Sequence, residues 1–468
     1  MTDLSKLARL DAIAQAELCA RGEVSAAELW AECLQRIALL NPLLRAVVTT
    51  ADEPSSAARS GPLSGVPFLM KDSSPWPGLR WTLGARLFRD RVTRQQTEYG
   101  RRLEQAGLMC AGKTALSEFG LLASTETLLE GATLNPWDLA CSPLGSSGGS
   151  AVAVAAGIVP LAHANDAGGS IRMPASACGL FGFKPSRGRT VTANRSGSEF
   201  ANMTSDHCVS RSVRDSALFL SLTEDLSLPA PVGFVREPGA RRLRIGAWTT
   251  TMVGKQPEAA VLRAHEAAIV LLSGLGHHVE HVEAPRYEVP ALNDAYYLTA
   301  AAAVASIVET IDRTRGEPVQ AEELEPFTWS LLDAFEARSL RAPEPDLQAV
   351  FARAVRAYDE ATQRFDVVLT PSVGIESVPV GYLSPILSRE TLEPRASRVL
   401  GYTPIHNIAG CPAMSVPLHW SDKGLPIGAH FAAAPGQDAL LLALAYELER
   451  AQPWAHRWPP YSIPMLLS

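Results

Sequence analysis

The chain alternates between short continuous runs of apolar residues and longer stretches in which apolar residues recur at helical spacing. The short runs predict buried β-strands, the clearest at residues 46–50, 63–70, 108–112, 243–248 and 365–370. The amphipathic stretches predict helices at residues 11–21, 97–106, 257–275 and 438–448. Strands that alternate with helices favour an α/β fold with helices on both faces of a sheet.

Helix-capping residues and segments rich in Pro and Gly mark further boundaries between the predicted elements. Ser25 and Glu28 form a capping box for a helix that we expect to end near Asn41 and Pro42. Residues 223–242 are rich in Pro, Gly and charge and predict a surface connector, and residues 379–394 predict a loop. Residues 290–362 are mostly helical in pattern and predict a cap over a substrate pocket. We expect one domain over residues 1–468, with the connector as an excursion.

Composition narrows the classes of partner. The net charge of −7 at pH 7 argues against nucleic acid as the main partner. The seven cysteines include no CxxC pair, which favours free thiols in a reducing compartment. No apolar run predicts a signal peptide or a membrane span, and no His/Cys spacing predicts a metal site. We therefore expect a cytoplasmic protein without a membrane or metal partner.

Candidate chemistry gathers in two Ser/Gly clusters that flank a small apolar helix. The first cluster is residues 145–150, Gly-Ser-Ser-Gly-Gly-Ser, and the second is residues 166–172, Asp-Ala-Gly-Gly-Ser-Ile-Arg. Glycine gives the backbone torsions that other residues avoid. The second cluster can aim the backbone N–H groups of Ala167, Gly168, Gly169 and Ser170 at one point, which suits an oxyanion hole.

A third block lies upstream, where residues 65–72 read Gly-Val-Pro-Phe-Leu-Met-Lys-Asp. The apolar neighbours of Lys71 suit a buried amine, and burial lowers the pKa of a lysine from its ordinary value of about 10.4. A neutral lysine can then act as a base towards a serine hydroxyl.

The three blocks, in this order and spacing, resemble the amidase signature family. The resemblance implies a Ser-Ser-Lys triad in which Ser170 is the nucleophile, Ser146 relays the proton and Lys71 is the general base. It also implies a cis peptide bond between Gly145 and Ser146, one large mixed sheet of around a dozen strands, and no cofactor. Three departures are Leu144 in place of a glycine, Asn165 in place of a threonine before Asp166, and His207-Cys208 in place of a Gly-Pro pair. They predict a stiffer loop before Ser146 and an altered pocket, and we expect none of them to touch the triad.

Other residues in these blocks have alternative roles. The resemblance places Thr125 and Glu126 at the rim of the pocket, and we expect them, with Gly145, to contact substrate. Lys113 is a second lysine, but we interpret it as structural because the Gly-Val-Pro context belongs to Lys71. We also expect Asp166 to form a structural ion pair with Arg172.

Several stretches are similar to family members that hydrolyse nylon oligomers, which implies cleavage of C–N bonds in small, apolar, non-peptide amides. A carbamate or aryl-acylamide hydrolase with the same triad is an alternative, because the oxyanion is equivalent. Another is the glutaminase subunit of a tRNA-dependent amidotransferase, against which the acidic balance argues. An inactive binding scaffold is the last. We expect a small-molecule substrate and, as a further expectation, a homodimer.

Overall fold

The computed structural model describes residues 4–54, 60–193, 198–228, 230–339 and 347–467. Two of the predicted regions reach beyond these residues. Residue 229 of the connector and residues 340–346 of the helical region lie outside the described residues.

Within the described residues, eleven strands form one mixed sheet in the order β1-β3-β2-β6-β8-β7-β12-β13-β11-β9-β10. Strand β2 is parallel to β3 and β6, whereas β6 and β8 are antiparallel. The prediction of an α/β fold with one large mixed sheet is confirmed. The strands are β1 (Val47–Thr50), β2 (Pro67–Lys71), β3 (Met109–Thr114), β6 (Leu161–Asp166), β7 (Phe181–Lys184), β8 (Ser205–Ser210), β9 (Arg244–Ala247), β10 (His278–His281), β11 (Val367–Pro371), β12 (Ala413–Trp420) and β13 (Pro426–Ala433), with a separate pair, β4 (Glu126–Thr127) and β5 (Gly131–Ala132).

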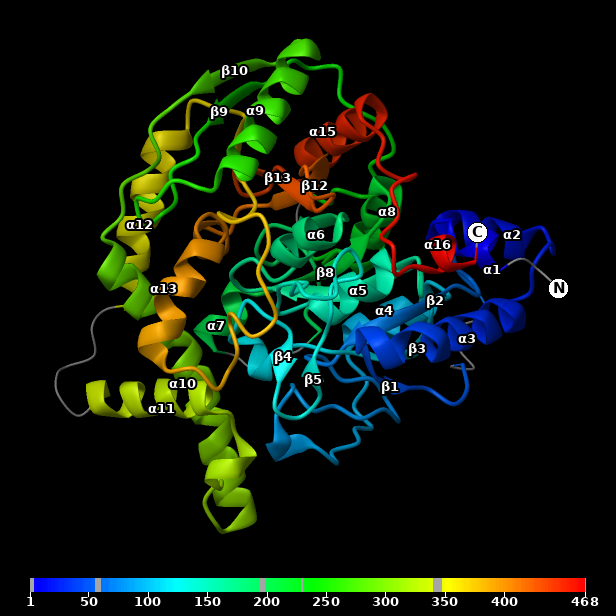
Figure 1. Cartoon of the computed structure of the whole chain (residues 1–468), viewed down its shortest axis with the longest axis horizontal. Helices are drawn as coiled ribbons and strands as arrows, with labels where there is room; N and C mark the ends of the chain where they lie inside the picture. Colours follow the sequence, from blue (N-terminus) through cyan, green and yellow to red (C-terminus); the bar gives the residue numbers. More distant parts are fainter. Residues whose placement is uncertain (1–3, 55–59, 194–197, 229, 340–346, 468) are drawn as a thin grey trace.

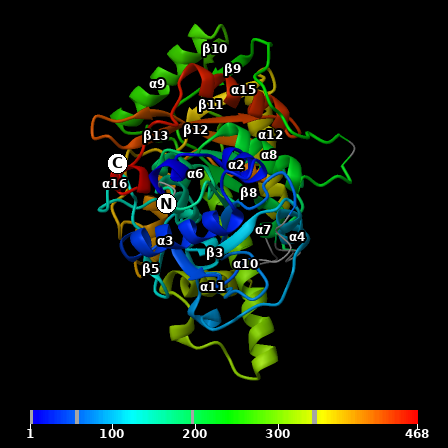
Figure 2. The same ribbon diagram turned by 90° about the vertical axis from the view of Figure 1, so that its right-hand side faces the viewer.

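Helices cover the sheet and extend beyond it (Figure 1). Helix α1 packs against α16, so both ends of the described chain lie close together (Figures 1 and 2). The α-helices are α1 (Leu4–Ala8), α2 (Ala12–Ala20), α3 (Ala26–Leu44), α4 (Glu98–Gln105), α5 (Gly148–Ala155), α6 (Arg172–Cys178), α7 (Glu199–Met203), α8 (Val213–Thr223), α9 (Ala259–Gly274), α10 (Val289–Arg315), α11 (Pro326–Ser339), α12 (Leu347–Thr362), α13 (Arg389–Val399), α14 (Pro404–Ile408), α15 (Asp438–Ala451) and α16 (Ile463–Leu466).

Strand β2 shows how the sheet separates two layers of core. Its side chains alternate between faces, as in any strand. Phe68 and Met70 pack in a cluster with residues of α2, α4 and α8, whereas Leu69 packs with residues of α3 and α5. Lys71 has the parity of Leu69, so the strand directs the lysine towards the layer that contains α5. The alternation thus places the lysine beside the first Ser/Gly cluster.

The predicted helical region forms α10, α11 and α12, and α10 packs against both of the others and against α7. In the described part of the chain, α10 is the one helix that is long and apolar enough to cross a membrane by length and composition. In Figure 1, α11 and the end of α10 project from the body below the sheet. Helix α10 reaches inward as well, because its residues line a cavity beside the sheet.

Two element predictions are wrong for the same reason. Helix α3 continues past Pro42 to Leu44, and α13 begins at Arg389, inside the predicted loop, with Pro394 in its interior. A proline removes one helical hydrogen bond and usually ends a helix. Here Leu44 and Leu392 are fully buried, so packing of the apolar face keeps both helices continuous.

Candidate active site

Lys71 ends β2 and is completely buried. Its Nζ lies 2.9 Å from Ser146 Oγ and 2.6 Å from Asn165 Oδ1, and both distances are hydrogen bonds. Burial lowers the pKa of Lys71 to about 7, although Asp166 and Asp206 oppose the change. The amine is therefore available in its neutral form near neutral pH, as a general base requires.

Ser146 lies in a tight turn just before α5. The peptide bond between Gly145 and Ser146 is cis, as predicted. A β-carbon on Gly145 would lie 2.0 Å from the carbonyl oxygen of Ser124, so only glycine fits there. Leu144, which stands where the family has glycine, adopts a positive φ of 59°. That left-handed conformation is strained for leucine, so the neighbouring contacts must hold this turn in place.

Ser170 follows the loop after β6 and is the most exposed of the three residues predicted to form the triad, at 9% against 2% for Ser146 and 0% for Lys71. In the described residues no hydrogen bond joins the hydroxyls of Ser170 and Ser146. The hydrogen bond between Lys71 and Ser146 that the predicted relay needs is thus present, and the one between Ser146 and Ser170 is not. Contacts of this kind often tighten only when substrate binds.

The loop before Ser170 leaves most of its backbone donors unused. In the described residues, the N–H groups of Ala167, Gly168 and Ser170 have no hydrogen-bond partner. The Gly169 N–H, in contrast, donates to Asp166 Oδ1 at 2.7 Å. Of the four predicted oxyanion-hole amides, Gly169 is therefore occupied, and the other three are free to bind an oxyanion.

A buried ion pair anchors this loop. Arg172 donates to both carboxylate oxygens of Asp166 at 2.9 Å. Burial alone would raise the pKa of Asp166, but the Arg172 guanidinium holds that pKa well below its usual range. Arg172 also donates to the carbonyl of Thr403 and to Asn407 Oδ1, and its Nη1 lies 3.1 Å from His430 Nε2. The predicted structural pair thus fastens the loop to the C-terminal part of the chain.

Thr125 and Glu126, predicted to contact substrate, are engaged with the backbone. The Thr125 hydroxyl accepts a hydrogen bond from the Gly148 N–H and donates to the Leu144 carbonyl. The carboxylate of Glu126 accepts from the Gly381 N–H. Both side chains therefore brace loops around the site, and contact with substrate stays a prediction for them and for Gly145.

Lys113 and His163 lie near the site with other partners. Lys113 Nζ forms a buried ion pair with Asp72 at 2.8 Å and donates to the Ser74 carbonyl. His163 Nδ1 accepts from the Lys71 backbone N–H, and its Nε2 lies 3.2 Å from Asp206. These contacts agree with the structural role predicted for Lys113.

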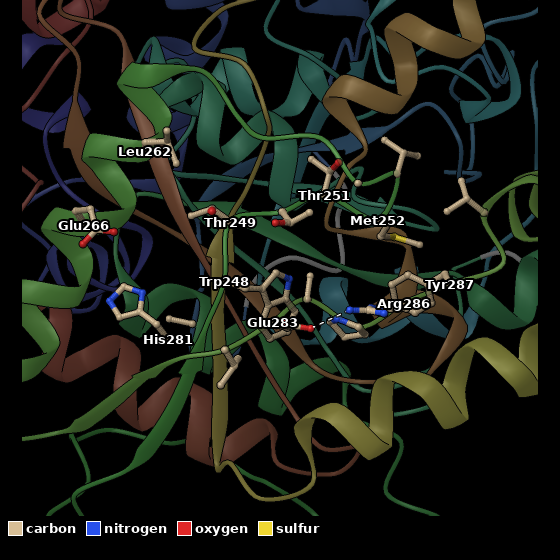
Figure 3. Close-up of a pocket in the computed structure, with 18 residues that line it drawn as sticks. Trp248, Thr249, Thr251, Met252, Leu262, Glu266, His281, Glu283, Arg286 and Tyr287 are labelled. Carbon is tan, nitrogen blue, oxygen red and sulfur yellow. Dashed lines mark hydrogen bonds and ion pairs between the residues drawn. The ribbon is translucent and has the colours of Figure 1, made fainter.

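Two hollows differ in their relation to the triad. A cavity of about 130 Å³ includes Asn165 and Ser73, which lie next to Lys71, and Phe200, together with Ala300 and Val304 of α10. A larger hollow of about 750 Å³ lies after β9 and β10 and contains no triad residue (Figure 3). Its residues include Trp248, Thr249, Thr251, Met252, His281 and Tyr287. The small cavity, not the large hollow, adjoins the candidate chemistry.

A family model described as amidase matches residues 28–442, which is most of the chain. The chain belongs to the amidase family. Sequence similarity extends over nearly the whole amidase: a putative amidase, AmiC, from Mycobacterium leprae is 37% identical, with 96% of each chain covered.

Solved structures of family members share the fold of this amidase. A 6-aminohexanoate cyclic dimer hydrolase complexed with substrate is 30% identical and has a TM-score of 0.86, with 97% of this chain and 99% of that chain covered. A bacterial aryl acylamidase of the amidase signature family is 25% identical and has a TM-score of 0.84 over 97% of this chain and 98% of that chain. The predicted resemblance to both the family and the nylon-oligomer hydrolase is confirmed.

Sequence reasoning missed three residues that hold the site of this amidase together. Asn165 accepts from Lys71 Nζ and donates to Ser73 Oγ at 3.0 Å. Thr403 donates to the Gly168 carbonyl, and Asn407 Nδ2 donates to Asp166. The prediction that the departure at Asn165 leaves the triad residues untouched is wrong, because the Asn165 amide oxygen contacts Lys71 Nζ directly. Thr403 and Asn407 lie more than 230 residues away, where no local signal points to the loop.

Proposed function

We propose that this amidase hydrolyses C–N bonds of small, apolar, non-peptide amides through an acyl-enzyme on Ser170. The observation that carries the proposal is the buried Lys71 amine 2.9 Å from Ser146 Oγ, on the route from the base to the nucleophile. Most residues of the adjacent cavity are apolar, such as Phe200, Ala300 and Val304, and suit an apolar substrate, although Asp206 also lines it.

In the first half-reaction, Ser170 Oγ attacks the amide carbon while its proton passes to Ser146, and the Ser146 proton passes to Lys71. The carbonyl oxygen becomes an oxyanion, which the N–H groups of Ala167, Gly168 and Ser170 can stabilise. When this intermediate collapses, the C–N bond breaks and the proton on Lys71 returns through Ser146 to the leaving nitrogen. The amine departs and an ester to Ser170 remains.

In the second half-reaction, water replaces the amine. Lys71 takes the water proton through Ser146, hydroxide oxygen bonds to the acyl carbon, and the ester C–O bond breaks as Ser170 recovers its proton. The products are a carboxylic acid and an amine. The cycle needs no group other than water, the triad and the backbone donors.

A carbamate or aryl-acylamide substrate is the second candidate. The close structural similarity to an aryl acylamidase favours it. The same attack on a carbamate carbon produces an equivalent oxyanion, so the triad need not change. The residues of the cavity, rather than the triad, would then decide between the two substrate classes.

A turnover screen tests both candidates. We expect the purified full chain to hydrolyse at least one class among linear amides, cyclic amides, anilides and aryl carbamates, with Ser170→Ala reducing turnover by at least about 10³-fold. Intact-mass spectrometry during turnover should show an acyl adduct on the wild type and none on Ser170→Ala. Undiminished hydrolysis by Ser170→Ala would refute the nucleophile. Failure of Ser170 to react with a fluorophosphonate would favour an inactive scaffold.

A further inference from the structure

Tyr296 lies directly against the loop that carries Ser170. The residue belongs to α10, and a β-carbon placed on Gly168 would lie 2.2 Å from the Tyr296 hydroxyl oxygen. The hydroxyl therefore occupies the space that any side chain at position 168 would need. Glycine at 168 allows the cap helix to reach the free N–H groups of this loop.

The Tyr296 hydroxyl forms no hydrogen bond with the described residues. Tyr402 and Tyr446, in contrast, each donate to a backbone carbonyl. Tyr296 is half-buried, so its hydroxyl stays accessible to a bound molecule. The ring of Tyr296 instead meets the rings of Phe200 and Tyr297, with centroids 6.2 and 5.9 Å away. The hydroxyl is thus a hydrogen-bonding group left available beside the candidate nucleophile.

The Tyr296 ring lines one hollow and packs against a residue that lines another. Phe200, which packs edge to face against Tyr296, lines the cavity of about 130 Å³ that contains Asn165. Tyr296 itself lines a hollow of about 40 Å³ together with Leu292 and Tyr297. Removing the ring would join the space beside Gly168 to this second hollow.

The proposed proton path decides which part of a substrate would meet Tyr296. The leaving nitrogen must take its proton from Ser146, so the amine part lies on the side of Lys71 and Asn165. The carbonyl oxygen turns towards the free N–H groups of the loop, so the acyl chain leaves the carbonyl carbon in the remaining direction, away from Lys71 and past the Tyr296 side chain that packs on Gly168. The acyl group, rather than the amine, is therefore the part that the Tyr296 ring limits.

We propose that Tyr296 is a specificity-determining residue that restricts this amidase to short acyl groups and donates a hydrogen bond to the bound substrate. The inference rests on the function proposed above and narrows its substrate class. The ring closes the acyl side of the site, and the hydroxyl binds a polar atom of the substrate equally in the ground state and the transition state.

A series of p-nitroanilides with unbranched acyl chains from acetyl to octanoyl tests the inference. We expect Tyr296→Ala to raise the ratio of kcat/KM for octanoyl over acetyl by at least about tenfold, since each accommodated methylene adds binding energy. Tyr296→Phe should keep the ratio within about twofold while KM rises about fivefold and kcat changes little. Tyr297→Ala is the matched control, because Tyr297 lines the same small hollow and should leave the ratio unchanged.

Each outcome bears on a different claim. An unchanged ratio in an active Tyr296→Ala enzyme would overturn this inference alone, as would an equal shift in Tyr297→Ala. Absence of Ser170-dependent turnover by the wild type would overturn the proposed function, and this inference with it. If thermal melting shows that Tyr296→Ala does not fold, Tyr296→Leu takes its place, with a smaller shift in the same direction expected.

Discussion

Asn165→Asp is the substitution that most directly tests Lys71 as the base. The amide oxygen of Asn165 lies 2.6 Å from Lys71 Nζ, and aspartate has nearly the same shape. The change therefore places a negative charge beside the amine and leaves the packing almost unaltered. A carboxylate at hydrogen-bonding distance favours the charged ammonium, which cannot accept a proton from Ser146.

The size of the effect follows from the contact. Burial holds the pKa of Lys71 at about 7. An opposite charge at this range raises such a pKa by about 1–3 units, and each unit corresponds to about 1.4 kcal/mol. The acidic limb of the kcat/KM profile should therefore move from near pH 7 to between about pH 8 and 10. Half of the wild-type amine is already charged at pH 7, so kcat/KM at that pH should fall by roughly 5- to 500-fold and recover as the pH rises.

The assay is kcat/KM from pH 5 to 10.5 on whichever substrate the turnover screen identifies. Asn165→Leu is the control, because it removes the acceptor without adding charge and should produce no upward shift. An active Asn165→Asp enzyme whose acidic limb coincides with that of the wild type would refute Lys71 as the base. An equal upward shift in Asn165→Leu would show that charge is not the cause.

Two further substitutions test the buried charges around the site. Burial and the neighbouring Glu118 raise the pKa of Glu325, so the contribution of this group to stability is present at low pH and lost as the pH rises through the raised pKa. Glu325→Gln should therefore have a free energy of unfolding higher than that of the wild type by on the order of 1 kcal/mol at pH 9, and no higher at pH 5. An equal difference at both pH values would contradict this. Asp166→Asn leaves Arg172 buried without its anionic partner and should lower the free energy of unfolding by about 3–5 kcal/mol in urea at pH 7, whereas a loss below about 1 kcal/mol would show that other contacts of Arg172 suffice.

The sequence predicted the parts of this amidase whose signals are local. Apolar strand runs, the Ser25 capping box and the Lys71 block each depend on neighbouring residues, and the structure contains all three. Proline was misleading because it is also a local signal: Pro42 and Pro394 lie inside helices that buried leucines hold together. Tertiary packing outweighed local preference at both positions.

The candidate site was predictable in its reactive groups but not in their supports. Lys71 and Ser146 meet as the blocks imply, whereas the occupied Gly169 N–H depends on where the Asp166 side chain turns. The contacts of Thr403 and Tyr296 with the loop join residues far apart in the chain. Such pairings follow from the path of the whole fold, which no single stretch encodes.

The anchoring of Arg172 to Thr403, Asn407 and His430 has a consequence during synthesis. A ribosome that has made both Ser/Gly clusters and the lysine block has still to add more than half of the chain. Until the segment around residue 403 emerges, the guanidinium lacks these acceptors and the nucleophile loop lacks its fastening. A nascent chain should therefore have no amidase activity until translation is nearly complete.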